Sequence, residues 1–163
     1  GIAATSMNDI AEHAQVAKVT VYRHFPDQET LVRTCSGQYF QRHPFPDPES
    51  WRHIKDPYDR FRHGLRETYA YHRATEPMIA RVIGEARDLP IMEPYREQWQ
   101  KAANMIAAAW PEQARDKTEL NAGLALALSF DTWRLLTRIG HLSDGDAINL
   151  MMRLVCDCRV NSG

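Results

Sequence analysis

Three prolines stand within eight residues of this chain, in the stretch "HPFPDPES" at positions 43–50. Proline has no backbone N–H and clashes with the preceding helical turn, so a helix does not run through such a stretch. On both sides of it, apolar residues recur at helical spacing, and strand patterns are nearly absent. The sequence therefore predicts an all-α protein, in which a linker separates a small N-terminal unit, residues 1–42, from a larger helical unit, residues 51–163.

Helical spacing and helix-ending residues divide these units further. Pro26 ends one helix, Asp27 can cap the next, and Pro111 ends another. Pro77 stands near the expected start of a short helix, and Ser143 can cap the last one. The expected helices cover residues 6–14, 17–25, 28–42, 56–75, 76–87, 91–110, 117–140 and a final segment from 143.

Composition restricts the class of protein. With 44% apolar and 25% charged residues in 163, the chain has an ordinary globular composition. No apolar run approaches the length of about 20 residues that a membrane span needs, and no leader pattern is visible at the start. The three cysteines do not form a disulfide framework, and reduced thiols in the cytoplasm are expected. The net charge of -1 provides no general attraction to nucleic acid, so any such binding must come from a local arrangement.

The segments 6–14 and 17–25, joined by a tight turn at 15–16, have the layout of a helix-turn-helix. In that motif the second helix enters the major groove of DNA. A plain helical hairpin with a solvated charged face would show the same spacing, and spacing alone leaves both interpretations open. In either case apolar side chains can close a small core between the helices, and these are Ile10, Ala14, Val16, Val21 and Phe25.

The second helix, within "AKVTVYRHF", keeps several polar residues for its outer side, at and just after its N-terminus. Side chains there reach phosphates and base edges, so Lys18 suits phosphate or guanine, and Val19 and Thr20 suit a thymine methyl. Other side chains nearby suit contacts to the DNA backbone that fix register. The predicted DNA-binding residues are Thr5, Ser6, Lys18, Val19, Thr20, Tyr22, Arg23 and His24.

The segment "TSMNDIAEHAQVAKVTVYRHFPDQETL" resembles the DNA-binding segment of TetR-family transcriptional regulators. The resemblance covers about 30 residues and implies a further helix ahead of residue 1. Three positions depart from the family pattern. Gln15 stands where the family usually has a glycine in the turn, and Val19 stands where it often has a small residue. Gln28 stands where the family commonly has a lysine that binds a DNA phosphate. The residues that carry the resemblance are Thr5, Ser6, Ile10, Ala11, Ala14, Val16, Tyr22, His24, Phe25, Glu29 and Leu31.

The resemblance also implies a C-terminal helical domain that binds a small-molecule effector. Aromatic and polarisable side chains in the larger unit are candidates for lining an apolar pocket, with three polar ones as contacts within it. Such a stripe is more often plain core than a ligand pocket. The candidates are Phe61, Tyr69, His72, Met78, Glu85, Tyr95, Trp99, Met105, Phe130, Trp133 and Arg134.

A homodimer is the second implication. The segment 117–140 is apolar on more than one side and holds small residues, and together with the last helix it offers more apolar surface than one face needs. A fully internal helix would show the same pattern. The candidate interface residues are Leu120, Leu124, Leu128, Ile148, Met151, Met152 and Val155.

No catalytic, metal or cofactor motif is apparent. The seven histidines include no HExxH and no pair four residues apart, and neither a nucleophile–base pair nor a phosphate-binding loop is recognisable. The resemblance to TetR-family regulators implies the expected function, a non-enzymatic, DNA-binding transcriptional regulator that acts as a homodimeric repressor and that a small molecule releases from its operator. An activator would have the same sequence features. The alternative is an all-helical small-molecule-binding protein or enzyme that does not bind DNA.

Overall fold

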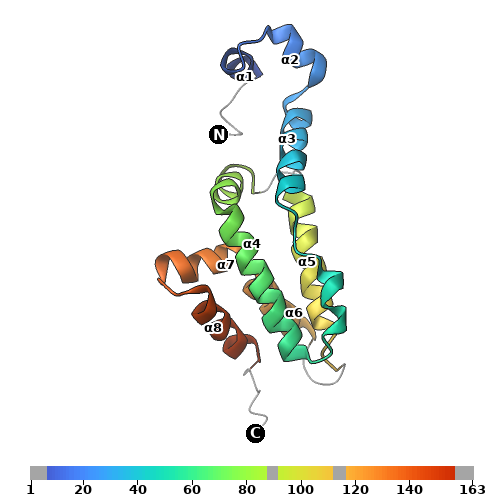
Figure 1. Ribbon diagram of the computed structural model, residues 1–163, viewed down its shortest axis with the longest axis vertical. Coiled ribbons are helices and arrows are strands. Elements are labelled where there is room, and N and C mark those ends of the chain that lie inside the picture. The colour runs from blue at the N-terminus through green and yellow to red at the C-terminus, as the bar shows by residue number, and fades with distance from the viewer. Residues whose placement is uncertain (1–6, 88–91, 112–116, 157–163) are drawn as a thin grey trace. The chain divides into compact units, whose positions relative to one another are not determined.

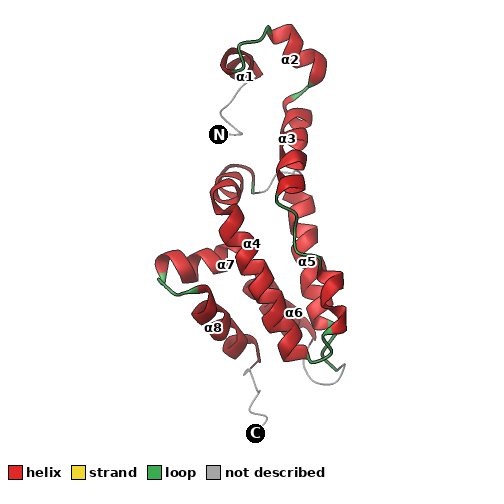
Figure 2. Ribbon diagram, in the orientation of Figure 1, coloured by secondary structure: helices red, strands yellow, loops and turns green. Residues whose placement is uncertain are grey.

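The computed structural model describes residues 7–87, 92–111 and 117–156, and every regular element among them is helical (Figures 1 and 2), which confirms the all-α class. None of the helices in these ranges combines the length and apolar character that crossing a membrane requires. The elements are α1 (Met7–His13), α2 (Lys18–His24), α3 (Gln28–Arg42), the 3-10 helix η1 (Pro48–His53), α4 (Pro57–Ala86), α5 (Glu93–Ala107), α6 (Lys117–Leu128), α7 (Phe130–Arg134), the π-helical η3 (Leu135–Ile139) and α8 (Asp144–Cys156).

Two compact units make up the chain, one of residues 1–45 with 75–94 and the other of residues 46–74 with 95–163. The division falls inside α4 and not only at the predicted linker. Helix α4 runs unbroken through Pro77, although the sequence predicts two helices that meet there. Pro77 cannot donate a hydrogen bond to the preceding turn, but Thr75 and Ile79 on either side of it are buried, and this packing offsets the loss.

A small core holds α1 and α2 together. Met7, Ala11, Val21 and Leu31 are buried in it, with Ile10 and Phe25 packed partly against it. The sequence places Val16 and Ala14 inside as well, but Val16 is 42% exposed and Ala14 is also exposed. Sequence spacing did not identify Met7 and Leu31 as core residues. Met7 is the first residue of α1 and Leu31 belongs to α3, and both complete this core.

The turn between α1 and α2 depends on Gln15, whose φ is 54°. Gln15 N–H donates to the Glu12 carbonyl at 3.1 Å, and Val16 N–H donates to the Ala11 carbonyl at 3.0 Å. These two bonds form a Schellman motif, in which the residue with positive φ is usually glycine because a Cβ is strained there. The Cβ of Gln15 is therefore in a strained position, and the turn keeps its geometry through these hydrogen bonds.

The predicted long helix 117–140 is interrupted at Ser129. This residue has φ -67° and ψ 136°, and its side chain accepts a hydrogen bond from Thr132 N–H, which starts α7. The carbonyls at the end of α6 are satisfied from α4: Tyr69 Oη donates to the Ala127 carbonyl at 3.1 Å, and His72 Nε2 lies 3.0 Å from the Leu128 carbonyl. Side chains of α4 thus replace the backbone donors that a continuous helix would have supplied.

The buried Arg60 joins η1 to α5. Its guanidinium donates to three backbone carbonyls, those of Arg52, Ile54 and Met105, with 2.9 Å between Nη1 and the Met105 oxygen. Hydrogen bonds of this kind compensate for taking the charge out of water. The C-terminal part of α5 is therefore held at a fixed position against the start of α4.

Replacing Gln15 by glycine is predicted to stabilise the protein. Glycine removes the Cβ that opposes a positive φ, and the gain should be about 1 kcal/mol in the free energy of unfolding. Urea unfolding of Gln15→Gly and Gln15→Ala measures this, since alanine removes the same polar atoms and keeps the strain. Equal stability of the two variants would contradict the account of the turn.

Acid is predicted to destabilise the protein through His72. Burial disfavours the charged imidazole and lowers the pKa of His72 to about 4, against opposite effects of the Leu128 carbonyl and Asp144. Between that pKa and the ordinary value of about 6.5, the unfolded chain binds more protons than the folded one, so stability falls as the pH drops from 6.5 towards 4. In His72→Gln, which retains an N–H donor, the free energy of unfolding should vary less over this range. An unchanged dependence on pH would rule out His72 as its source.

Candidate functional site

Helix α2 presents one side of its surface to solvent. Val19 is 74% exposed and Tyr22 is 48% exposed, and Lys18 and Arg23 are exposed beside them. Val21, by contrast, is 6% exposed in the core with α1. At about 100° per residue, this burial turns Val19 and Arg23 to the side opposite the core and Tyr22 to the flank, whereas Lys18 is exposed as the first residue of the helix. The face predicted to meet DNA is therefore the exposed face of α2.

The charge of this face is positive. Helix α2 has the sequence KVTVYRH, with Lys18 and Arg23 and no carboxylate. His24 is exposed and adds a further nitrogen donor, whereas Thr20 is half-buried. A chain with a net charge of -1 thus carries a local cationic surface, and phosphates are attracted to such a surface over short distances.

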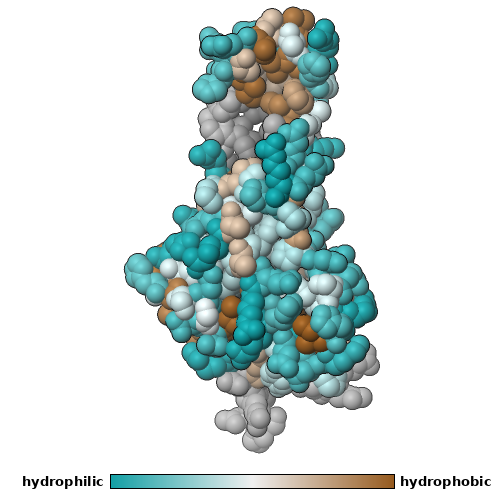
Figure 3. All heavy atoms as spheres, in the orientation of Figure 1, coloured by the Kyte–Doolittle hydropathy of each residue, from teal (hydrophilic) through white to brown (hydrophobic). Residues whose placement is uncertain are grey.

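Hydrophobic atoms accompany these charges. Figure 3 shows hydrophobic atoms gathered over the part of the chain that holds α1 and α2, with hydrophilic atoms around them. Val19 and Val16 are the large aliphatic side chains that α2 and its preceding turn expose. Methyl groups next to cations suit a DNA groove, where thymine methyls lie close to phosphates.

The position of α2 is fixed at its C-terminal end as well. Phe25 has φ -132° and ψ 92°, an extended conformation that Pro26 favours in the residue before it. Asp27 then caps α3, since its carboxylate accepts a hydrogen bond from Thr30 N–H at 2.7 Å. The predicted cap is confirmed. Thr5 and Ser6 of the predicted DNA-binding set, and the side chain of Gln28, lie outside the part that the structure describes.

Most of the predicted effector-pocket residues form one buried ring cluster. It is centred on His72, whose ring centroid lies 4.9 Å from that of Trp99 and 5.4 Å from that of Phe130. The Leu128 carbonyl can only accept, so His72 Nε2 carries the proton and Nδ1 is an acceptor; within the described part Nδ1 is buried and has no hydrogen-bond partner. The cluster consists of Tyr69, Tyr71, His72, Tyr95, Trp99, Phe130 and Trp133.

The other predicted pocket residues that the structure describes do not join this cluster. Phe61 packs edge-on against Trp110 at 6.2 Å, and Arg134 is exposed. Met105 is buried and offers its carbonyl to Arg60. Met78 belongs to the other compact unit, and the side chain of Glu85 lies outside the described residues. Sequence spacing missed Tyr71, which contributes to the ring cluster although it lies next to His72 in α4.

The predicted dimer-interface residues are all buried within a single chain. Helix α6 packs against α8 and α7. The seven buried side chains are Leu120, Leu124, Leu128, Ile148, Met151, Met152 and Val155. The large apolar side chains that α6 and α8 expose are Leu126, which is 57% exposed, and Leu154, which is 52% exposed. A surface groove of about 280 Å³ includes both of them, lined by Glu119, Leu120, Ala122, Gly123, Leu126, Met151, Leu154 and Val155.

Comparison with known proteins agrees with the geometry of α1, the turn and α2. Residues 1–35 match the family model described as "Bacterial regulatory proteins, tetR family". No curated protein and no solved structure matches the chain. The matched residues include α1, the turn at Gln15 and the whole of α2, whose exposed face is cationic. Residues 1–35 thus carry the DNA-binding domain of the TetR family of bacterial transcriptional regulators.

Proposed function

We propose that this regulator acts in the cytoplasm as a homodimeric repressor, and that a small-molecule effector releases it from operator DNA. The observation that supports the DNA-binding surface is the outward face of α2, on which Lys18, Val19 and Tyr22 are exposed while Val21 is buried. An activator would use the same contacts. Reporter expression from the operator, with and without the chain, distinguishes the two.

The side chains of α2 take separate roles on DNA. Lys18 contacts a phosphate or a guanine edge, and the methyls of Val19 lie against a thymine methyl. The hydroxyl of Thr20 contacts a nearby base or phosphate. Contacts to the DNA backbone that hold the helix in register come from Tyr22, Arg23 and His24, and from Thr5 and Ser6.

Removing the two cations of α2 is predicted to weaken DNA binding. Each of Lys18→Ala and Arg23→Ala should lower affinity about tenfold and reduce the slope of log affinity against log salt by about one for each recognition helix. Fluorescence anisotropy measures this, with a duplex that the full chain has selected from a random library. The chain offers a control with the same loss of charge, Lys101→Ala, on α5 in the other compact unit.

Equal effects of Lys18→Ala and Lys101→Ala would contradict this surface, because general charge would then account for binding. Failure to bind any duplex would favour the alternative function, an all-helical protein that binds only a small molecule. Val19→Ala is expected to alter base preference at one position of each half-site and to leave the dependence on salt unchanged.

The homodimer is proposed to form through the outward sides of α6 and α8. Leu126 and Leu154 supply exposed apolar surface next to the groove between these helices. The buried side chains of α6 and α8 form the core beneath this surface. A two-fold pair of such surfaces is self-complementary, because each chain offers the same patch to the other.

Charged residues on this surface are predicted to separate the two chains. Leu126→Asp combined with Leu154→Asp should give the mass of one chain in sedimentation at micromolar concentration, where the unmodified protein gives the mass of two. Tyr58→Asp is the matched control, since Tyr58 is 50% exposed and lies on α4, outside the proposed interface. A dimer that persists in the double variant would place the interface elsewhere.

The ring cluster is the proposed origin of the response to an effector. Its aromatic side chains and the unpartnered Nδ1 of His72 suit an apolar ligand with one hydrogen-bond donor, if the cluster opens to admit it. A ligand that binds better to a form with wrongly spaced recognition helices would shift the population towards that form. The two helices of a DNA-bound dimer must lie about 34–36 Å apart to enter successive major grooves.

A further inference from the structure

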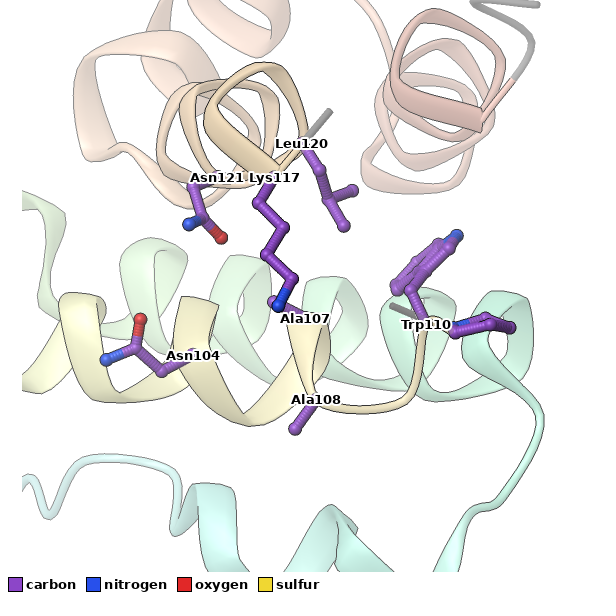
Figure 4. A pocket seen from close by; sticks show the side chains of 8 residues that line it. Asn104, Ala107, Ala108, Trp110, Lys117, Leu120 and Asn121 are labelled. Carbon is purple, nitrogen blue, oxygen red and sulfur yellow. The ribbon is translucent and has the colours of Figure 1, made fainter. Parts of the chain in front are cut away.

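A cleft separate from the ring cluster lies between the end of α5 and the start of α6 (Figure 4). Its volume is about 320 Å³, at the small end of the range of about 300–1000 Å³ found for small-molecule sites. None of its residues was predicted from the sequence to bind an effector. The lining consists of Asn104, Ala107, Ala108, Trp110, Pro111, Lys117, Leu120 and Asn121.

The polar groups of this cleft favour an anion. Among the lining residues that the structure describes, Lys117 is the charged one, and Figure 4 shows it extending from α6 towards Ala107. It is also the first residue of the twelve-residue α6, where the helix dipole adds positive potential. The cleft thus joins a cation to the positive end of a helix.

Two amides can supply neutral hydrogen bonds beside this cation. Asn104 Oδ1 accepts a hydrogen bond from Gln100 Nε2 at 3.0 Å, which leaves its NH₂ group as the donor for a ligand. Asn121 lies one helical turn after Lys117 on α6, and Figure 4 shows its amide next to the lysine side chain. One ammonium with two amides fits the two oxygens of a carboxylate.

The other end of the cleft is aromatic and held in place. The Trp110 ring packs edge-on against Tyr58 at 5.9 Å and Phe61 at 6.2 Å. Arg60 fixes the nearby Met105 carbonyl, so the end of α5 has little freedom to move. Leu120 and the alanines add methyl groups. This surface suits a flat apolar ring, which gains from offset or edge contact with an indole.

We propose that this cleft binds a small aromatic carboxylate. The carboxylate lies against Lys117 and the amides of Asn104 and Asn121, and the ring lies between Trp110 and the aliphatic lining. The proposal concerns binding alone and does not depend on the chain binding DNA.

Calorimetric titration of the full chain with 2-naphthoate tests the proposal. A dissociation constant below one millimolar is expected. The neutral 2-naphthamide, of the same shape, should bind at least tenfold more weakly to the unmodified protein, and this comparison requires no variant. Lys117→Gln should weaken 2-naphthoate binding at least tenfold, and Trp110→Leu should weaken it as well.

Lys101→Gln is the matched control, because Lys101 is exposed on α5 and does not line the cleft. Its affinity for 2-naphthoate should stay within twofold of that of the unmodified protein. Equal weakening by Lys101→Gln and Lys117→Gln would overturn the proposal in favour of general surface charge. Equal affinity for the amide, equal affinity for acetate, or no binding at millimolar concentration would overturn it too.

Discussion

The packing of Val21 against α1 is the interaction on which the proposed DNA-binding surface depends. Together with Met7, Ala11 and Leu31, Val21 is withdrawn from solvent, and this fixes the rotation of α2 about its axis. A seven-residue helix has little stability of its own, so its orientation must come from such contacts. The same burial turns Val19 and Arg23 outward, and the hydrogen bonds around Gln15 set the direction in which α2 leaves the turn.

A second constraint organises the C-terminal helices. Tyr69 and His72 of α4 satisfy the last carbonyls of α6, which allows the chain to leave the helix at Ser129 and restart as α7. Asp144 at the start of α8 then takes hydrogen bonds from Arg73 and from Trp133 Nε1, which connects α4, α7 and α8. Although burial opposes it, the hydrogen bonds from Arg73 and Trp133 keep the pKa of this carboxyl below its usual value. Donors on α4 therefore decide where the neighbouring helices begin and end.

The sequence predicts much of this fold, because helix ends and exposed faces leave local signals. The cap at Asp27 and the outward Val19 both follow from short stretches of sequence. The break at Ser129 and the continuity through Pro77 could not be predicted in this way. The break at Ser129 depends on donors of α4 that are distant in sequence. The continuity through Pro77 depends on the burial of its neighbours Thr75 and Ile79, which only the three-dimensional packing shows.

The apolar helix α6 shows a further limit of spacing arguments. Leu124 and Leu128 are fully buried, whereas Leu126 is 57% exposed, although all three are leucines of one helix. A core and an interface between chains have similar compositions, so only the three-dimensional packing shows which side of α6 is exposed. The cleft beside Lys117 was hidden for a related reason, because its residues come from two helices and the turn after the first.

The central claim is that α2 reads DNA as one of a pair. Selection of duplexes by the unmodified full chain from a random library, followed by sequencing, tests it most directly. The account predicts an enriched inverted repeat whose half-sites are centred about 34–36 Å apart, or a multiple of that distance. A library that shows no enrichment of any sequence over the input would contradict it.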